Sequence, residues 1–133
     1  MGIDLGAARV GVAISDDLGM LAHPLETIHV AKTNPTNRIV ELATERAVNA
    51  IVVGVPRNMD GSHGPASQAA REFVEQLKLR VSCRVVTWDE RLSTVSAQRS
   101  LREAGRSAKQ QRNVIDQAAA QVILQSWLDA QCI

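Results

Sequence analysis

Residues 50–56 read AIVVGVP, an uninterrupted apolar run that ends at a proline. A run this short and this apolar is typical of a strand that is covered on both faces, because a half-exposed strand alternates apolar and polar residues. Covering both faces of a sheet takes helices on each side of it. The run therefore favours an α/β fold.

The order of the remaining segments supports this interpretation. Three strand-like runs joined by turns come first, and the later strands alternate with segments of helical apolar spacing. We expect strands over 1–5, 9–15, 20–30, 50–56 and 83–88, and helices capped by Asn34, by Ser93 or Thr94, and by Asn113, with a further helix starting at Pro65. This order predicts a mixed sheet with helices on its faces, within one domain that spans residues 1–133.

Three carboxylates stand where such a sheet places functional groups. Asp4 lies within the first apolar run, Glu90 follows the fifth, and Asp116 lies at the expected start of the last helix. Open α/β sheets bind ligands beyond the carboxyl ends of their strands. Clustered carboxylates repel one another unless a cation lies between them, and hard oxygen ligands suit Mg²⁺ or Mn²⁺. Two such ions about 3.5–4 Å apart support phosphodiester cleavage, so all three acids are candidate metal ligands and catalytic residues.

Each acid also has a simpler explanation. Asp4 can cap the turn at Gly6, and Glu90 can be a solvated loop residue. Asp116, three residues after Asn113, can complement the positive end of the last helix. Sequence spacing does not decide between these alternatives and a shared site, because only the fold can bring the three side chains together.

Basic residues are concentrated just before Asp116. Five of the fifteen Lys and Arg residues fall within one short segment, offset by a single glutamate, and they are Arg99, Arg102, Arg106, Lys109 and Arg112. Such local positive charge suits contacts with a phosphate backbone, so nucleic acid is the expected partner. A solvated helix end whose cations favour the helix dipole is the alternative.

The loop RNMDGSHG, residues 57–64, follows the fourth strand. Its glycines permit close approach of the backbone to a ligand, and Arg57 and Asn58 can donate hydrogen bonds to it. A long connection with no ligand is the alternative. His63 can serve as a proton shuttle or a ligand, but an ordinary surface histidine is the favoured interpretation, and neither His23 nor His29 stands at a metal-ligand spacing from it.

Composition limits the remaining classes of function. The formal net charge is +1, so any site for a polyanion has to come from local clustering. One Phe, two Trp and no Tyr argue against an aromatic base-stacking platform. Cys83 and Cys132 form no CxxC pair, and no apolar stretch reaches about 18 residues. We therefore expect a cytoplasmic protein with reduced cysteines, no signal peptide and no membrane partner.

Four blocks of the sequence, in order and spanning nearly the whole chain, together resemble one family. They are GIDLGAARVGVAISD, IVVGVPRNMDGSHG, DERLST and IDQAAAQVILQSWLD. The chain resembles the bacterial YqgF family, also called the RuvX or Holliday-junction-resolvase-like family, which lies in the ribonuclease H-like superfamily. The resemblance implies a five-stranded mixed sheet with flanking helices and a metal-dependent nuclease site built from Asp4, Glu90 and Asp116.

The resemblance also implies substrates and further site residues. The substrate is either the 5′ end of precursor 16S ribosomal RNA or branched DNA, the former being preferred for bacterial members. Substrate or metal-shell roles are implied for residues that match family motifs near the site, namely Arg9, Gly54, Pro56, Asn58, Gly61, Arg91 and Thr94. Ala7 and Ala8 depart from the family pattern, where Thr or Ser and a Lys are more usual.

Several functions stay open at this point. The first is maturation of structured RNA by a metal-dependent endonuclease, and the second is resolution of branched DNA by a homodimer. A non-catalytic nucleic-acid-binding module of the same fold is the third. The block GIDLG also resembles the opening of sugar-kinase and actin-type ATPases, but those enzymes enclose the nucleotide with a second lobe, for which 133 residues leave no room. Either a monomer or a homodimer fits the sequence.

Overall fold

The structure is a computed structural model that describes residues 1–93 and 109–131, with side chains in the second segment described from Asp116 onward. The described strands and helices follow the expected alternation. They are β1 (Gly2–Leu5), β2 (Arg9–Ser15), β3 (Ala22–His29), α1 (Pro35–Glu45), β4 (Ala50–Val55), α2 (Pro65–Lys78), β5 (Arg84–Asp89), the 3₁₀ turn η1 (Glu90–Leu92) and α4 (Lys109–Gln131).

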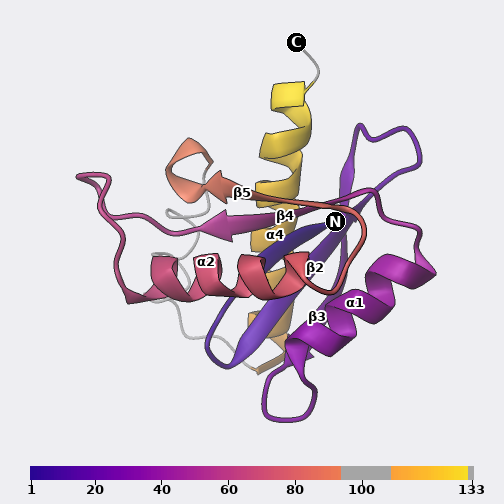
Figure 1. Ribbon diagram of the computed structural model, residues 1–133, viewed down its shortest axis with the longest axis horizontal. Coiled ribbons are helices and arrows are strands. Elements are labelled where there is room, and N and C mark those ends of the chain that lie inside the picture. The colour runs from indigo at the N-terminus through magenta and orange to yellow at the C-terminus, as the bar shows by residue number, and fades with distance from the viewer. Residues whose placement is uncertain (94–108, 132–133) are drawn as a thin grey trace.

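The strands form one sheet of five, in the order β3-β2-β1-β4-β5. β1 pairs antiparallel with β2, and β2 with β3, whereas β1, β4 and β5 run parallel to one another. The predicted mixed sheet is therefore confirmed. β4 and β5 end on the same side of the molecule, where η1 and the loop before α2 begin (Figure 1).

Helices cover the sheet on both faces (Figure 1). α2 packs on β4 and β5, and α1 packs on α2 and β3, which encloses the larger apolar cluster around Ile3, Val53 and Phe73. α4 crosses β1, β2, β3 and β4 on the other face and encloses a smaller cluster that includes Val52 and Ile123. Every residue of β4 is buried, as its continuous apolar sequence predicts.

Glycines allow α4 to lie unusually close to the sheet. A Cβ atom added to Gly11 would stand 2.1 Å from the carbonyl oxygen of Asp116, and one added to Gly2 would stand 2.6 Å from Cβ of Leu124. One added to Gly54 would stand 2.5 Å from Cδ1 of Ile123. β1, β2 and β4 thus each contribute a residue without a side chain beneath α4, and this fixes where the helix crosses.

Local signals in the sequence give mixed results. The cap at Asn34 is confirmed, because its Oδ1 accepts a hydrogen bond from the amide of Asn37 at 3.0 Å. Pro24 lies on the edge strand β3, beside a register shift between Val12 and Ala13. The predicted cap at Asn113 is wrong: α4 begins at Lys109, so Asn113 lies inside the helix. The helix expected to end near residue 104 lies outside the described residues.

No helix in the described part of the chain has the length and apolar character needed to cross a membrane.

Candidate active site

Asp4 occupies the centre of the sheet on the face covered by α4. It is only 3% exposed, and it stands directly opposite Gly11 in the antiparallel β1–β2 register. The parallel register pairs Ile3 with Val53, so Gly54 follows on the other side of Asp4. A buried carboxylate is costly unless charged or hydrogen-bonding groups compensate it. Asp4 is therefore flanked by two glycines, and what lies over them determines its surroundings.

Asp116 lies over the first of these glycines. The close approach of α4 at Gly11 brings the Asp116 backbone onto β2, and the Asp116 residue is 5% exposed. Arg9, two residues before Gly11 and hence on the same sheet face, donates from Nε to Asp116 Oδ2 at 2.7 Å. The alternative explanation, in which Asp116 complements the helix N-terminus, is wrong because α4 begins seven residues earlier.

Glu90 lies beside the second glycine. It follows β5 directly as the first residue of η1, and it is 1% exposed. Its Oε1 would stand 2.9 Å from a Cβ atom at Gly54. The alternative of a solvated loop acid is wrong for Glu90, because a solvated carboxylate would be exposed. Neighbouring Asp89 points to the opposite face, since it pairs with Val55 of β4.

The structure thus brings the three predicted acids to one face and one end of the sheet. Asp4 lies between the two glycines, with Asp116 over one and Glu90 beside the other. Carboxylate oxygens are the ligands that Mg²⁺ and Mn²⁺ prefer, so the residue types fit a divalent cation. Among the described residues, however, no group of three or more His, Cys, Asp or Glu side chains has the arrangement of a formed metal site. The donor chemistry fits a cation, and the Arg9–Asp116 ion pair compensates part of the negative charge.

Three of the candidate substrate-binding residues lie at the same end of the sheet as this cluster. Arg57 and Asn58 belong to the loop after β4, and Arg91 belongs to η1. Arg57 donates from Nε to the carbonyl oxygen of Gly61 at 2.9 Å and from Nη1 to Asp89 at 3.4 Å. Arg91 donates from Nη2 to the same Asp89 carboxylate at 2.7 Å. Asp89 therefore holds both arginines at the end of the sheet, and hydrogen bonding to Arg91 lowers the pKa of Asp89 below its ordinary value.

Hydrogen bonds within the loop itself fix its shape. The amide and hydroxyl of Ser62 both donate to Asp60 Oδ1, and Asn58 Nδ2 donates to the Ser62 hydroxyl at 2.9 Å. The Ser62 bonds lower the pKa of Asp60. Gly61 adopts a φ of +88°, a conformation that L side chains rarely adopt. Asp60 therefore serves to hold this turn.

The remaining candidate substrate-binding residues, Thr94 and those of the basic segment, fall at or beyond the limits of the described structure. Thr94 and Arg106 lie outside the described residues, as do Arg99 and Arg102. Lys109 and Arg112 lie at the start of α4, where only the helical backbone is described. Their roles stay predictions.

Sequence reasoning did not single out Arg71 or Asp89. Asp89 accepts hydrogen bonds from both Arg57 and Arg91 and so orders them. Arg71 lies on α2 and lines a cavity together with Arg57 and His63. The signal was present, because Arg71, Glu75 and Lys78 stand at positions i, i+4 and i+7 of the helix and share one side of it.

Comparison with known proteins identifies relatives along the whole chain. A protein of Ruegeria sp. (strain TM1040) is 48% identical over 130 residues, covering 97% of this chain and 83% of the relative. A protein of Listeria monocytogenes is 45% identical over 132 residues, covering 97% of this chain and 96% of the relative. Both carry the name "Putative pre-16S rRNA nuclease".

A solved structure shares the fold. T. thermophilus RuvC in complex with Holliday junction substrate aligns with a TM-score of 0.55 at 16% sequence identity, covering 98% of this chain and 92% of that chain. This likeness confirms the expected ribonuclease H-like α/β fold. The family model described as "RuvX: Holliday junction resolvase" matches residues 1–130. The chain therefore belongs to the RuvX family, as its four sequence blocks predict.

Proposed function

We propose that this protein is an endonuclease that hydrolyses phosphodiester bonds in precursor 16S ribosomal RNA. The observation that carries the proposal is the convergence of three buried carboxylates, from β1, η1 and α4, around Gly11 and Gly54. Buried acids of this number are rare in a protein interior unless charged partners compensate them. The names of the relatives from Ruegeria and Listeria support precursor 16S ribosomal RNA as the substrate.

Asp4, Glu90 and Asp116 would hold Mg²⁺ or Mn²⁺ in this proposal. Bound divalent ions would activate water and stabilise the leaving oxygen, and a pair of them would act on both at once. Asp4 lies at the centre of the three, with Glu90 and Asp116 on either side, so these three carboxylates would together hold the cation. Arg9 compensates the charge of Asp116 and would release it when a cation takes over that role.

The rim of the site would bind the substrate backbone. Arg57, Asn58 and Arg91 stand at the same end of the sheet as Glu90. Guanidinium groups make strong, paired hydrogen bonds to phosphate oxygens, and Asp89 presents two of them. Lys109 and Arg112, at the start of α4, precede Asp116 on the same helix and would extend this contact.

Branched DNA is the second candidate substrate. It is supported by the description of the matching family model, and by the solved RuvC structure that contains a Holliday junction. A resolvase makes symmetric cuts across a four-way junction, which requires two copies of the site. The two candidates therefore differ in substrate and in the oligomeric state that each requires.

One experiment separates these candidates. A precursor 16S ribosomal RNA fragment and a four-way DNA junction are each offered to the wild type with Mn²⁺ or Mg²⁺, and to the variants Asp4→Asn and Asp116→Asn. Asp129→Asn is the matched control, because it makes the same change on the same helix as Asp116 but at an exposed position. We expect the wild type and Asp129→Asn to cut the RNA, and both site variants to lose cutting while they keep their fold by circular dichroism.

Each other outcome is informative. Cutting of RNA by Asp4→Asn at the wild-type rate would refute the assignment of the site. Paired, symmetric nicks in the junction, with intact RNA, would favour the resolvase. Binding of either nucleic acid without any metal-dependent cutting would favour a binding module of this fold.

A further inference from the structure

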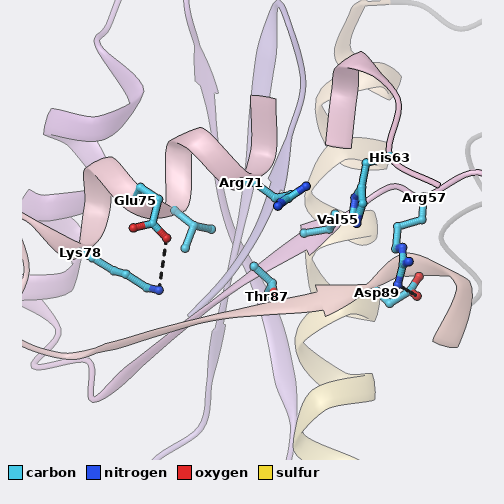
Figure 2. A pocket seen from close by; sticks show the side chains of 9 residues that line it. Val55, Arg57, His63, Arg71, Glu75, Lys78, Thr87 and Asp89 are labelled. Carbon is cyan, nitrogen blue, oxygen red and sulfur yellow. Dashed lines mark hydrogen bonds and ion pairs between the residues drawn. The ribbon is translucent and has the colours of Figure 1, made fainter. Parts of the chain in front are cut away.

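A cavity of about 440 Å³ lies on the sheet face opposite the three carboxylates. It is bounded by α2 on one side and by the ends of β4 and β5 on the other, as Figure 2 shows. Val55 and Val74 form its apolar floor, and most of the remaining lining is charged or polar: Arg57, His63, Arg71, Glu75, Lys78 and Asp89. The three acids do not line this cavity, and Arg57 of the proposed rim is shared with it.

Positive charge predominates in the cavity. Lys78 Nζ stands 3.4 Å from Glu75, so these two side chains balance each other. Asp89 is shared, since it lies 3.4 Å from Arg57 but 2.7 Å from Arg91 outside the cavity. Two guanidinium groups thus face one carboxylate.

Arg71 adds a further positive charge. Within the described part of the chain it makes no hydrogen bond or ion pair, and it extends from α2 toward Val55 and His63 (Figure 2). An arginine that projects into a cavity already rich in cations is electrostatically unfavourable unless solvent or an anion compensates it. The side chain is therefore available to a ligand.

His63 adds an uncharged donor to these two arginines. Loss of water contact lowers the pKa of His63, and the neighbouring Arg71 and Arg57 lower it further, which favours the neutral ring. Its Nδ1 contacts the Ser67 hydroxyl. With that hydroxyl as the donor, the ring carries its proton on Nε2 and can donate it to a ligand. Two guanidinium groups and an imidazole N–H suit a tetrahedral oxyanion.

The cavity and the carboxylates share one edge of the sheet. Val55 and Asp89 are register partners that face the cavity. Their sequence neighbours, Gly54 before Val55 and Glu90 after Asp89, face α4. The loop from Arg57 to Gly64 leaves β4 at this edge. A nucleic-acid strand bound at the carboxylates can therefore continue over this edge of the sheet, past Arg57, and reach Arg71.

We propose that this cavity binds a phosphate of the substrate's backbone, on the far side of the sheet edge from the bond that is cut. The proposal rests on the proposed nuclease function for the identity of the substrate. The same donors would accept inorganic phosphate, so the shared chemistry is a phosphate oxyanion and the experiment has to distinguish the two sources.

Binding of the precursor RNA fragment is measured in the Asp4→Asn background, so that no cleavage interferes. Arg71→Gln removes the uncompensated cation, Glu75→Gln removes an anion from the same cavity, and Arg46→Gln is the matched control at the opposite end of the sheet. We expect Arg71→Gln to weaken binding several-fold and to reduce the slope of log K against log salt by about 0.7, the value for one contact to a single strand. Glu75→Gln should strengthen binding, and Arg46→Gln should not change it.

Opposite signs for Arg71→Gln and Glu75→Gln would not arise from a general loss of stability. Equal effects of Arg71→Gln and Arg46→Gln would overturn the proposal. Inorganic phosphate alone is titrated in parallel while the His63 ring signals are followed by NMR. If phosphate shifts these signals but Arg71→Gln leaves RNA binding intact, the cavity binds free phosphate and the backbone assignment is wrong. If Arg71→Gln weakens RNA binding while the wild type, with Asp4 intact, cuts no RNA, the cavity assignment holds and the nuclease function fails.

Discussion

The two faces of the sheet differ sharply at the edge where β4 and β5 end. The face under α4 holds Asp4, Glu90 and Asp116, all nearly inaccessible to solvent, with Arg9 as a cationic partner. The face under α2 holds an open cavity rich in arginine and lysine. The side chains of Asp89 and Glu90 are consecutive in sequence, yet they serve opposite faces because successive strand residues alternate.

The difference teaches that burial and pairing give adjacent carboxylates different tasks. Asp89 accepts hydrogen bonds from Arg57 and Arg91, so it orients these two guanidinium groups. Glu90 lies against Gly54 beneath α4, where a carboxylate is costly to keep without a functional reason. A chain under selection for stability alone gains nothing from a second buried acid beside Asp4.

Substituting Asp89 and Glu90 one at a time is the strongest test of the difference between the two faces. We expect Glu90→Gln to reduce RNA cleavage to the level seen without a divalent cation, since it removes a charged ligand and changes little in shape. Asp89→Asn should keep cleavage and raise KM, because Arg57 and Arg91 lose their shared partner. Steady-state kinetics on the precursor fragment measure both. Equal losses of kcat in the two variants would mean that Asp89 and Glu90 do not have separate roles in substrate binding and cleavage.

The close packing of α4 sets the second test. A Cβ atom at Gly11 would stand 2.1 Å from the Asp116 carbonyl oxygen, so Gly11→Ala forces the helix away from β2. We expect a loss of about 3 kcal/mol in the free energy of unfolding, the upper part of the range for overpacking. Gly64→Ala, at the start of α2, is the control, because its nearest neighbour would be Asn58 at 3.7 Å. Urea unfolding compares them, and similar losses would show that α4 is not tightly seated.

The third test concerns the compensation of Asp116. Arg9→Gln removes a charge-assisted hydrogen bond from a carboxylate that is almost fully buried, which costs about 1–2 kcal/mol. If the acids hold a cation, Mn²⁺ should then raise the melting temperature more in Arg9→Gln than in the wild type, because the ion no longer competes with the guanidinium. Asp116→Asn in either background should abolish the extra shift. If Mn²⁺ raised the melting temperature equally in both proteins, Arg9 would not compete with the cation.

The sequence predicts the three acids on the α4 face better than it predicts the residues that surround them. Asp4 interrupts an apolar segment, Glu90 follows one, and Asp116 stands before the apolar face of the last helix, so all three are easily recognised. The roles of Gly11 and Gly54 depend on which strands become neighbours, and this is fixed by the tertiary register rather than by local sequence.

The wrong helix start and the unpredicted Arg71 have local physical reasons. Asn113 is a residue type that often caps a helix, but the preceding Lys, Gln and Arg residues are good helix formers and the helix extends through them. Nothing in the local sequence distinguishes Arg71 from other polar residues of α2, since Ala70 and Val74 belong to the buried stripe of the helix. Only the cavity beside that stripe distinguishes it.

The smallest expected effect concerns an ion pair on the same face as the cavity. Glu26 of β3 accepts from Arg38 of α1 at 2.8 Å and 2.9 Å, and these bonds hold the pKa of Glu26 below its ordinary value of 4.5. Because the folded pKa is lowered, the pair stabilises the protein above about pH 4.5 and loses this contribution as pH falls through the lowered pKa. We expect Glu26→Gln to cost about 0.2–1 kcal/mol at pH 7 and progressively less as the pH falls below 4.5. Urea unfolding at pH 7 and at a series of lower pH values measures it, with the exposed Glu45→Gln as control, and a cost that does not fall with pH would mean that the Glu26 side chain stabilises by packing instead of charge.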